Sequence, residues 1–240
     1  MGDTQQTDQD NAKLRKLDSG GTEGPTEYSK YSNISSLEKR GEKLLHDVAK
    51  AEDARRDLLY DLFERSIITE TETRKIRSCY DFLIGRIRSA IGNPQLETKK
   101  ELLKAKLRTY SEEFVRMVEE NIEPYFWVSS LVKGTMLRLK ADYYRYLFET
   151  HPKCGNYQIL AHNAYTHAKS FFTTNHLTKT PEWHRLRLNY AALLYLDGFP
   201  TAAMFICQQL LKVCKNKKID SAFERRVKKN VDFFKRATLD

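Results

Sequence analysis

A line of charged residues runs along one predicted helix near the middle of the chain. The segment from Leu137 to Glu149 reads LRLKADYYRYLFE and contains no Gly or Pro, which predicts a helix. Four of its charged residues are three or four positions apart and therefore share one face: Arg138, Asp142, Arg145 and Glu149. Aliphatic and aromatic residues fill most of the other faces, so we expect the helix to be largely buried.

Two arginines on a buried face require negative partners. A buried guanidinium group is costly unless it meets an anion. Asp142 can satisfy only one of Arg138 and Arg145, which indicates an anion from outside the helix. Guanidinium groups suit phosphate oxygens because they offer paired donors in one plane, and the hydroxyl of Tyr146 adds a donor beside Arg145. The line therefore predicts an anion-binding wall, with an internal ladder of ion pairs as the alternative.

Other residues that could do chemistry form no catalytic pattern. His162 and His167 are five positions apart and do not share a helix face. The chain has no HExxH motif, no Gly-rich phosphate loop and no defensible Ser-His-Asp spacing. Cys207 and Cys214 fall on a predicted helix and are expected to pack rather than react. We therefore predict no enzymatic activity, no metal and no cofactor.

The composition is that of a globular chain. Of 240 residues, 40% are hydrophobic, which is enough for a core, and the 10 Gly and 6 Pro are too few for a many-stranded β fold. The opening MGDTQQTDQD lacks the apolar core of a secretory signal, and no apolar run reaches membrane-spanning length. The four cysteines include no CxxC pair. A reducing, cytoplasmic location is expected.

The charge is unevenly distributed along the chain. The net charge is +9, and the first 35 residues hold six acidic and four basic side chains. Residues 36–240 therefore carry +11. Such an excess indicates an anionic partner, either nucleic acid, a membrane surface or a phosphoprotein.

Helical periodicity dominates the chain after a polar start. We predict a disordered N-terminal tail over residues 1–35 and a single helical domain over residues 36–240. The domain is expected to contain about nine antiparallel helices with short connectors, beginning at an N-cap in Ser35-Ser36. A helical solenoid of the TPR type stays open.

Gly and Pro mark several of the predicted helix boundaries. Gly92-Asn93-Pro94 ends one helix, and another begins near Pro181 and ends at Gly198. Gly85 lies inside a strong helical pattern, where it costs about 1 kcal/mol relative to Ala. Close helix packing is the predicted reason for this glycine.

The run LRLKADYYRYL resembles the fifth helix of the 14-3-3 family, which carries a similar Lys-x-Asp-Tyr-Tyr-Arg-Tyr sequence. Three further segments, Arg74–Ser89, Thr180–Asp197 and Ala222–Phe234, resemble the third, seventh and last helices of that family in the same order. The resemblance implies an all-α bundle of nine helices with TPR-like superhelical packing. It also implies a non-enzymatic adaptor whose groove binds phosphoserine or phosphothreonine peptides of client proteins.

The resemblance assigns the groove residue by residue. The phosphate would be held by Arg88, Arg145 and Tyr146, and the peptide main chain by Asn189 and Asn230. The supporting groove positions are Arg138, Asp142, Leu188, Phe223 and Phe234.

Three positions depart from the family pattern. Asp81 replaces a phosphate-binding Lys, Leu196 replaces a Glu, and Arg226 replaces a Leu. An anion in place of a cation beside the phosphate is expected to weaken binding.

The family also predicts assembly and a modification. A homodimer, or a heterodimer with a paralogue, would pair Lys50 and Asp53 with residues near Lys106 and Glu113. The terminal FFKRATLD resembles the C-terminal phosphothreonine motif that the family binds, so Thr238 is a candidate phosphosite, the alternative being a frayed helix end.

Two other functions stay open at this point. One is a helical-repeat scaffold that binds unphosphorylated peptides. The other is a basic helical protein that binds RNA or another polyanion, although the chain lacks exposed aromatics between its basic residues and any known RNA-binding module.

Overall fold

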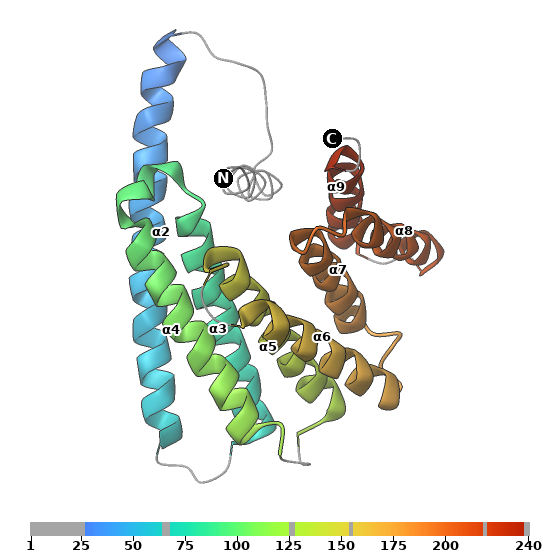
Figure 1. Cartoon of the computed structure of the whole chain (residues 1–240). Helices are drawn as coiled ribbons and strands as arrows, with labels where there is room; N and C mark the ends of the chain where they lie inside the picture. The colour runs from blue at the N-terminus through green and yellow to red at the C-terminus, as the bar shows by residue number, and fades with distance from the viewer. Residues whose placement is uncertain (1–26, 64–67, 125–127, 154–155, 218–219, 238–240) are drawn as a thin grey trace. The chain divides into compact units, whose positions relative to one another are not determined.

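The protein is built from helices. The computed structural model describes residues 27–63, 68–124, 128–153, 156–217 and 220–237. Every regular element in these residues is helical, which confirms the predicted all-α class (Figure 1). The elements are α2 (Glu27–Phe63), α3 (Glu70–Ile91), the short 3₁₀ helix η2 (Pro94–Lys99), α4 (Lys100–Asn121), α5 (Ser130–Thr150), α6 (Tyr157–Thr174), α7 (Pro181–Leu196), α8 (Pro200–Lys217) and α9 (Ser221–Ala237).

The chain divides into two compact units. We call Gly21–Met136 the N-terminal unit and the part within Leu137–Asp240 the C-terminal unit. The division falls inside α5. This division does not test the prediction of a single domain. No helix in the described part of the chain is long and apolar enough to cross a membrane.

In the N-terminal unit, α3 packs against both α2 and α4. Its buried face includes Ile76, Tyr80 and Leu83, and the Tyr80 ring lies 5.3 Å from the ring of Phe114 on α4. Burial of these apolar side chains is the main force that holds the three helices together.

Ion pairs also connect α2 with α4. Arg55 Nε donates to Glu113 Oε1 at 2.9 Å, and Lys106 Nζ donates to Glu52 Oε2 at 2.7 Å. Lys106 and Glu113 were predicted to lie opposite a partner subunit. Lys106 is paired with Glu52, and Glu113 is paired with Arg55, within the same chain. The dimer prediction therefore cannot rest on the charges of Lys106 and Glu113.

The first described helix is longer than the sequence predicted. α2 begins at Glu27, so residues 27–35 are helical and the helix start predicted at Ser35-Ser36 is wrong. The physical reason is that no Gly or Pro interrupts residues 26–40, and a polar composition alone does not stop a helix. The rest of the predicted tail lies outside the described residues.

Other helix boundaries follow local signals. The side chain of Asn93 accepts a hydrogen bond from the backbone of Gln95, and Pro94 starts η2, which confirms the break predicted there. Thr180 caps α7 by accepting from the backbone N–H of Trp183, with Pro181 in the first turn. Gly198 ends the α7 region with a φ of 81°, a conformation that favours glycine.

Gly85 corrects another expectation. A Cβ added at this exposed glycine would meet no atom within 4 Å among the described residues. Close helix packing is therefore not the reason for the glycine, and nothing in the structure explains it.

The C-terminal unit has its own core where α7, α8 and α9 meet. The core residues are Leu188 and Ala191 from α7, Ala203, Cys207 and Leu210 from α8, and Val227, Val231, Phe233 and Phe234 from α9. The packing prediction for the two helical cysteines is confirmed, since Cys207 and Cys214 are both buried and free. Burial raises the pKa of the Cys207 thiol to about 12, which keeps it protonated and unreactive at neutral pH.

Candidate functional site

The predicted charged line lies on a buried face of α5. The exposed fractions of Arg138, Asp142 and Arg145 are 6%, 1% and 6%. These values confirm that the helix is largely buried. Charged groups at this depth must be hydrogen-bonded and paired, so their partners decide what the site can do.

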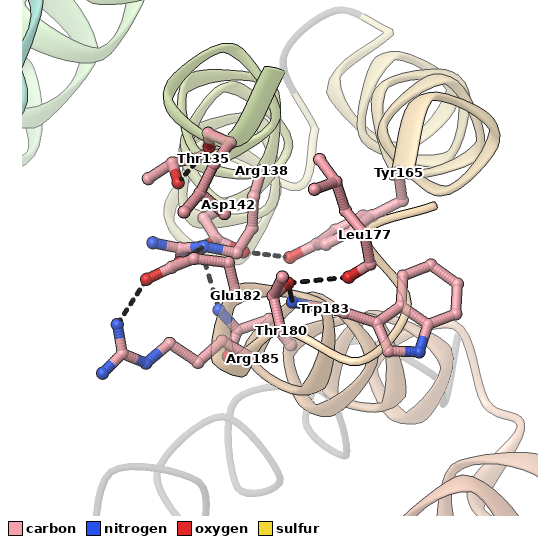
Figure 2. Close-up of polar contacts among 11 residues, drawn as sticks. Thr135, Arg138, Asp142, Tyr165, Leu177, Thr180, Glu182, Trp183 and Arg185 are labelled. Atoms are coloured by element: carbon pink, nitrogen blue, oxygen red, sulfur yellow. Dashed lines mark hydrogen bonds and ion pairs between the residues drawn. The ribbon is translucent and has the colours of Figure 1, made fainter. Parts of the chain in front are cut away.

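Asp142 is the centre of the network. Its Oδ2 accepts a hydrogen bond from Asn189 Nδ2 at 2.8 Å and another from Arg138 NH1. Its Oδ1 accepts from the hydroxyl of Tyr165 at 2.6 Å. One carboxylate therefore ties α5 to α6 and α7, and Figure 2 shows Arg138, Asp142 and Tyr165 in this arrangement.

Arg138 is satisfied by two carboxylates. Besides its contact with Asp142, it donates from Nε to Glu182 Oε2 at 2.9 Å (Figure 2). Glu182 stands in the first turn of α7, directly after Pro181, and also accepts from Arg185 NH1 at 2.6 Å. For Arg138, the anion expected from outside the helix is the carboxylate of Glu182 on α7.

Arg145 is held differently. Its Nε donates to the Tyr165 hydroxyl at 3.3 Å, and its NH1 donates to Glu149 Oε1. Its guanidinium carbon lies 4.6 Å from the centre of the Tyr146 ring, a cation–π arrangement. Among the described residues, the second terminal nitrogen, NH2, has no hydrogen-bond partner. This side chain therefore keeps one pair of donors unused.

The electrostatics favour a charged Arg145 and a protonated Tyr165. Burial opposes the charge of Arg145, but the attraction of Glu149 together with that of the neighbouring tyrosines and Asp142 outweighs it, so the pKa of Arg145 is raised. Burial, followed by the charge of Asp142, raises the pKa of Tyr165. The Tyr165 hydroxyl thus stays a donor to Asp142 and an acceptor from Arg145.

The two predicted amides lie in different surroundings. Asn189 joins the network through Asp142, while its amide oxygen has no partner among the described residues. Asn230 is half-buried on α9. The structure thus brings Arg138, Asp142, Arg145 and Asn189 together, with Tyr146 beside Arg145.

Several supporting positions are occupied in packing. Leu188 and Phe234 have exposed fractions of 2% and 1% and belong to the core of α7, α8 and α9. Phe223 is half-buried, with its ring centre 6.5 Å from that of His184. Core packing is the role that the structure gives to Leu188 and Phe234.

The remaining predicted positions are on α3, α7 and α9. Arg88 is half-buried and Asp81 exposed, both on α3 in the N-terminal unit. Leu196 is half-buried at the end of α7, and Arg226 is exposed on α9. Thr238 lies outside the described residues.

Two members of the network were missed from the sequence. Tyr165 shares the apolar face of α6 with Ala161 and Ala168. Its spacing therefore predicts only an aromatic side chain packed in the core. Glu182 follows a first-turn proline, where an acid is explained by the helix dipole alone. Glu149 lies on the predicted line of charges, four residues after Arg145. This spacing was the sequence signal that Glu149 is the carboxylate partner of Arg145.

The site offers no metal centre. Within the described ranges, no group of three His, Cys, Asp or Glu residues is placed to hold a metal ion.

No protein-family model matches the chain, and no curated protein matches it either.

Proposed function

We propose that the chain is an adaptor, similar to the 14-3-3 family, that binds phosphoserine or phosphothreonine segments of client proteins. The observation that carries the proposal is the unused donor pair of Arg145 NH2, on a side chain fixed by Tyr165 and Glu149. A fixed guanidinium group with one pair of donors available suits a phosphate oxygen, because little flexibility is lost on binding.

The neighbouring groups would complete the recognition. Tyr146 stands beside Arg145 and supplies a phenolic hydroxyl as a further donor. Asn189 donates to Asp142, which fixes its amide and leaves its oxygen to accept a peptide N–H group. Arg138 would have a structural role, because its guanidinium group is already bound by Asp142 and Glu182.

The proposal includes non-enzymatic action in the cytoplasm, on phosphorylated clients, and assembly as a dimer. The sequence resemblance is its second support. Asp81, which stands where the family has a phosphate-binding Lys, would make this chain weaker towards phosphate than the family pattern.

The site is tested with a fluorescent peptide of the form Arg-x-x-phosphoserine-x-Pro. We expect Arg145→Lys to reduce its affinity at least about tenfold, because a lysine keeps the charge but loses the fixed pair of donors. Arg185→Lys is the matched control, since Arg185 lies in the same network but points its exposed guanidinium to Glu182. If the two variants lost equal affinity for the peptide, with unchanged melting temperatures, Arg145 would not be part of the phosphate site.

A polyanion-binding function is the second candidate. Its support is the exposed basic surface of α9, made up of Arg225, Arg226, Lys228, Lys229, Lys235 and Arg236. Binding of this kind weakens steeply with salt and ignores phosphoserine placement. RNA binding that survives Arg145→Lys but is lost in Arg225→Gln/Lys229→Gln would favour it.

A further inference from the structure

Arg187 is a half-buried arginine of α7 that has no carboxylate partner among the described residues. Its NH2 nitrogen donates to Oε1 of Gln209 on α8. Its Nε and NH1 nitrogens make no hydrogen bond in the described part of the chain. The Gln209 amide is neutral, so it fixes the position of the guanidinium group without cancelling its charge.

Several buried or half-buried arginines elsewhere in the chain lie against carboxylates. These pairs are Arg55 with Glu113, Arg86 with Asp47, Arg138 with Asp142, and Arg145 with Glu149. A carboxylate partner is expected there, because a cation that is partly removed from water is costly without an anion. Arg187 departs from this pattern, since its described partner is an uncharged amide.

The carboxylates of the C-terminal unit have other partners or are exposed. α6 and α8 contain no acidic residue. The pairs in α5, α7 and α9 are Asp142 with Arg138, Glu149 with Arg145, Glu182 with Arg138 and Arg185, and Glu224 with Lys228. Asp197, the C-cap of α7, accepts from Gln158. Asp220 and Asp232 are exposed and form no ion pair with Arg187 among the described residues.

The thiol of Cys207 on α8 does not supply the missing anion. Burial raises its pKa to about 12, so the thiol stays neutral at physiological pH. Burial also lowers the pKa of Arg187, and the interaction that opposes this shift comes from Cys207 and not from a carboxylate. Arg187 nevertheless stays charged, because a guanidinium group is not deprotonated in proteins. The contact of α7 with α8 therefore holds a positive charge that an external anion could balance.

Further donors lie beside the Arg187 guanidinium group. The Nε2 group of Gln209 has no partner among the described residues, because the contact with Arg187 uses only the amide oxygen. Lys212 is exposed and follows Gln209 by three residues, which makes the two side chains neighbours on α8. A phosphate group has more acceptor oxygens than a carboxylate, so it can use donors from several side chains at once. This set of donors therefore suits phosphate better than carboxylate.

We propose that Arg187, Gln209 and Lys212 form a second anion site, at the contact of α7 with α8, which binds a phosphate group. Arg187 supplies paired donors in one plane, Gln209 supplies an amide N–H group, and Lys212 supplies a positive charge. The ligand is either free phosphate or a phosphate monoester. Arg187 contacts α8 and is not a member of the Asp142 network, so the inference does not rest on phosphopeptide binding at Arg145.

The arginine Nε–H signals of the isotope-labelled full chain test the site by NMR at about pH 6.5, where a phosphate monoester is largely doubly charged. Arg187→Lys identifies the Arg187 signal by its loss. We expect this signal to shift saturably with inorganic phosphate, with a dissociation constant on the order of 1 mM, and acetate at equal ionic strength to bind at least about tenfold more weakly. A separate titration with β-glycerophosphate distinguishes the two sources, since an equal shift assigns phosphate monoesters and no shift assigns free phosphate.

A pair of glutamine variants separates a specific site from general charge attraction. Gln209→Glu places a carboxylate against Arg187, so it should weaken phosphate binding at least about tenfold, with a melting temperature that is unchanged or higher. Gln208→Glu is the matched control, because it adds the same charge at the adjacent, exposed position of α8 and should keep the wild-type affinity. Equal weakening by both variants would overturn the proposal. So would an Arg187 signal that responds to phosphate no more than that of Arg116, which is exposed on α4, or that responds equally to acetate.

Discussion

A single buried carboxylate, Asp142, organises the candidate site. It accepts hydrogen bonds from Arg138, Tyr165 and Asn189, which come from three different helices. Across the network, three arginines (Arg138, Arg145 and Arg185) meet three carboxylates (Asp142, Glu149 and Glu182). This balance makes burial of the charges tolerable, and it also makes each member hard to remove.

Replacing Asp142 by Asn should be strongly destabilising. The shape is kept but the charge is lost, and Arg138 remains buried with one carboxylate fewer. We expect the free energy of unfolding to fall by about 3 kcal/mol, as is typical when one partner of a buried pair is removed. Urea denaturation measures this, with the exposed Asp232→Asn as control. A loss equal to that of the control would mean that Asp142 is not the centre of the network.

Tyr165→Phe tests the bridge between Asp142 and Arg145. The variant removes one hydroxyl and leaves the buried Arg145 Nε without its acceptor, which should cost about 1–3 kcal/mol of stability. Tyr190→Phe is the matched control, because its ring is 5.6 Å from that of Tyr165 and its hydroxyl has no hydrogen bond among the described residues. Melting curves of the two variants should differ clearly, and identical curves would contradict the bridge.

The sequence predicted the line of charges but not its partners. Helical spacing placed Arg138, Asp142 and Arg145 on one face, because all three belong to one helix. Tyr165 and Glu182 come from other helices, and only tertiary packing decides that their oxygens reach this face. The anion that the sequence predicted from outside the helix is, for Arg138, a carboxylate of the chain itself.

At the scale of the helices, local signals predicted the boundaries best. Pro181 and the Gly92-Asn93-Pro94 break lie at element ends, as expected from proline stereochemistry. The helix start predicted at Ser35-Ser36 is wrong, because a polar composition does not stop a helix and no Gly or Pro interrupts the segment after residue 26. The packing predicted for Gly85 is wrong because a glycine in a helix does not by itself show whether a neighbouring element approaches it.

Two glycines offer a matched pair of substitutions. Gly85→Ala should raise the free energy of unfolding by about 1 kcal/mol, because alanine favours a helix and the added methyl group meets open space. Gly198→Ala should lower it by about 1–2 kcal/mol, because a φ of 81° is strained for a residue with a Cβ. Chemical denaturation of both variants should show opposite signs, and a destabilised Gly85→Ala would reveal a contact that the structure does not contain.

At the scale of the whole molecule, tyrosines with raised pKa values link stability to alkaline pH. The Tyr110 hydroxyl donates to Glu52 at 2.6 Å, and burial together with that carboxylate raises the pKa of Tyr110 to about 12. The unfolded chain loses this proton near pH 10, so the folded state binds more protons between about pH 10 and 12. Stability should therefore fall as the pH rises through that window.

Unfolding free energies measured from about pH 9 to 11.5 would show this decline. Tyr110→Phe should make the decline smaller without abolishing it, because the pKa values of Tyr80 and Tyr165 are raised too. A decline of equal steepness in wild type and variant would mean that Tyr110 titrates alike in the folded and unfolded chains.

The most direct measurement of the central claim is the affinity of wild-type protein for one peptide in two forms. Fluorescence anisotropy would compare a labelled Arg-x-x-phosphoserine-x-Pro peptide with its unphosphorylated twin at physiological salt. The donors of Arg145 and Tyr146 predict that the phosphorylated form binds at least about tenfold more tightly. Equal affinity for both forms would contradict the phosphopeptide function and favour a scaffold for unphosphorylated peptides.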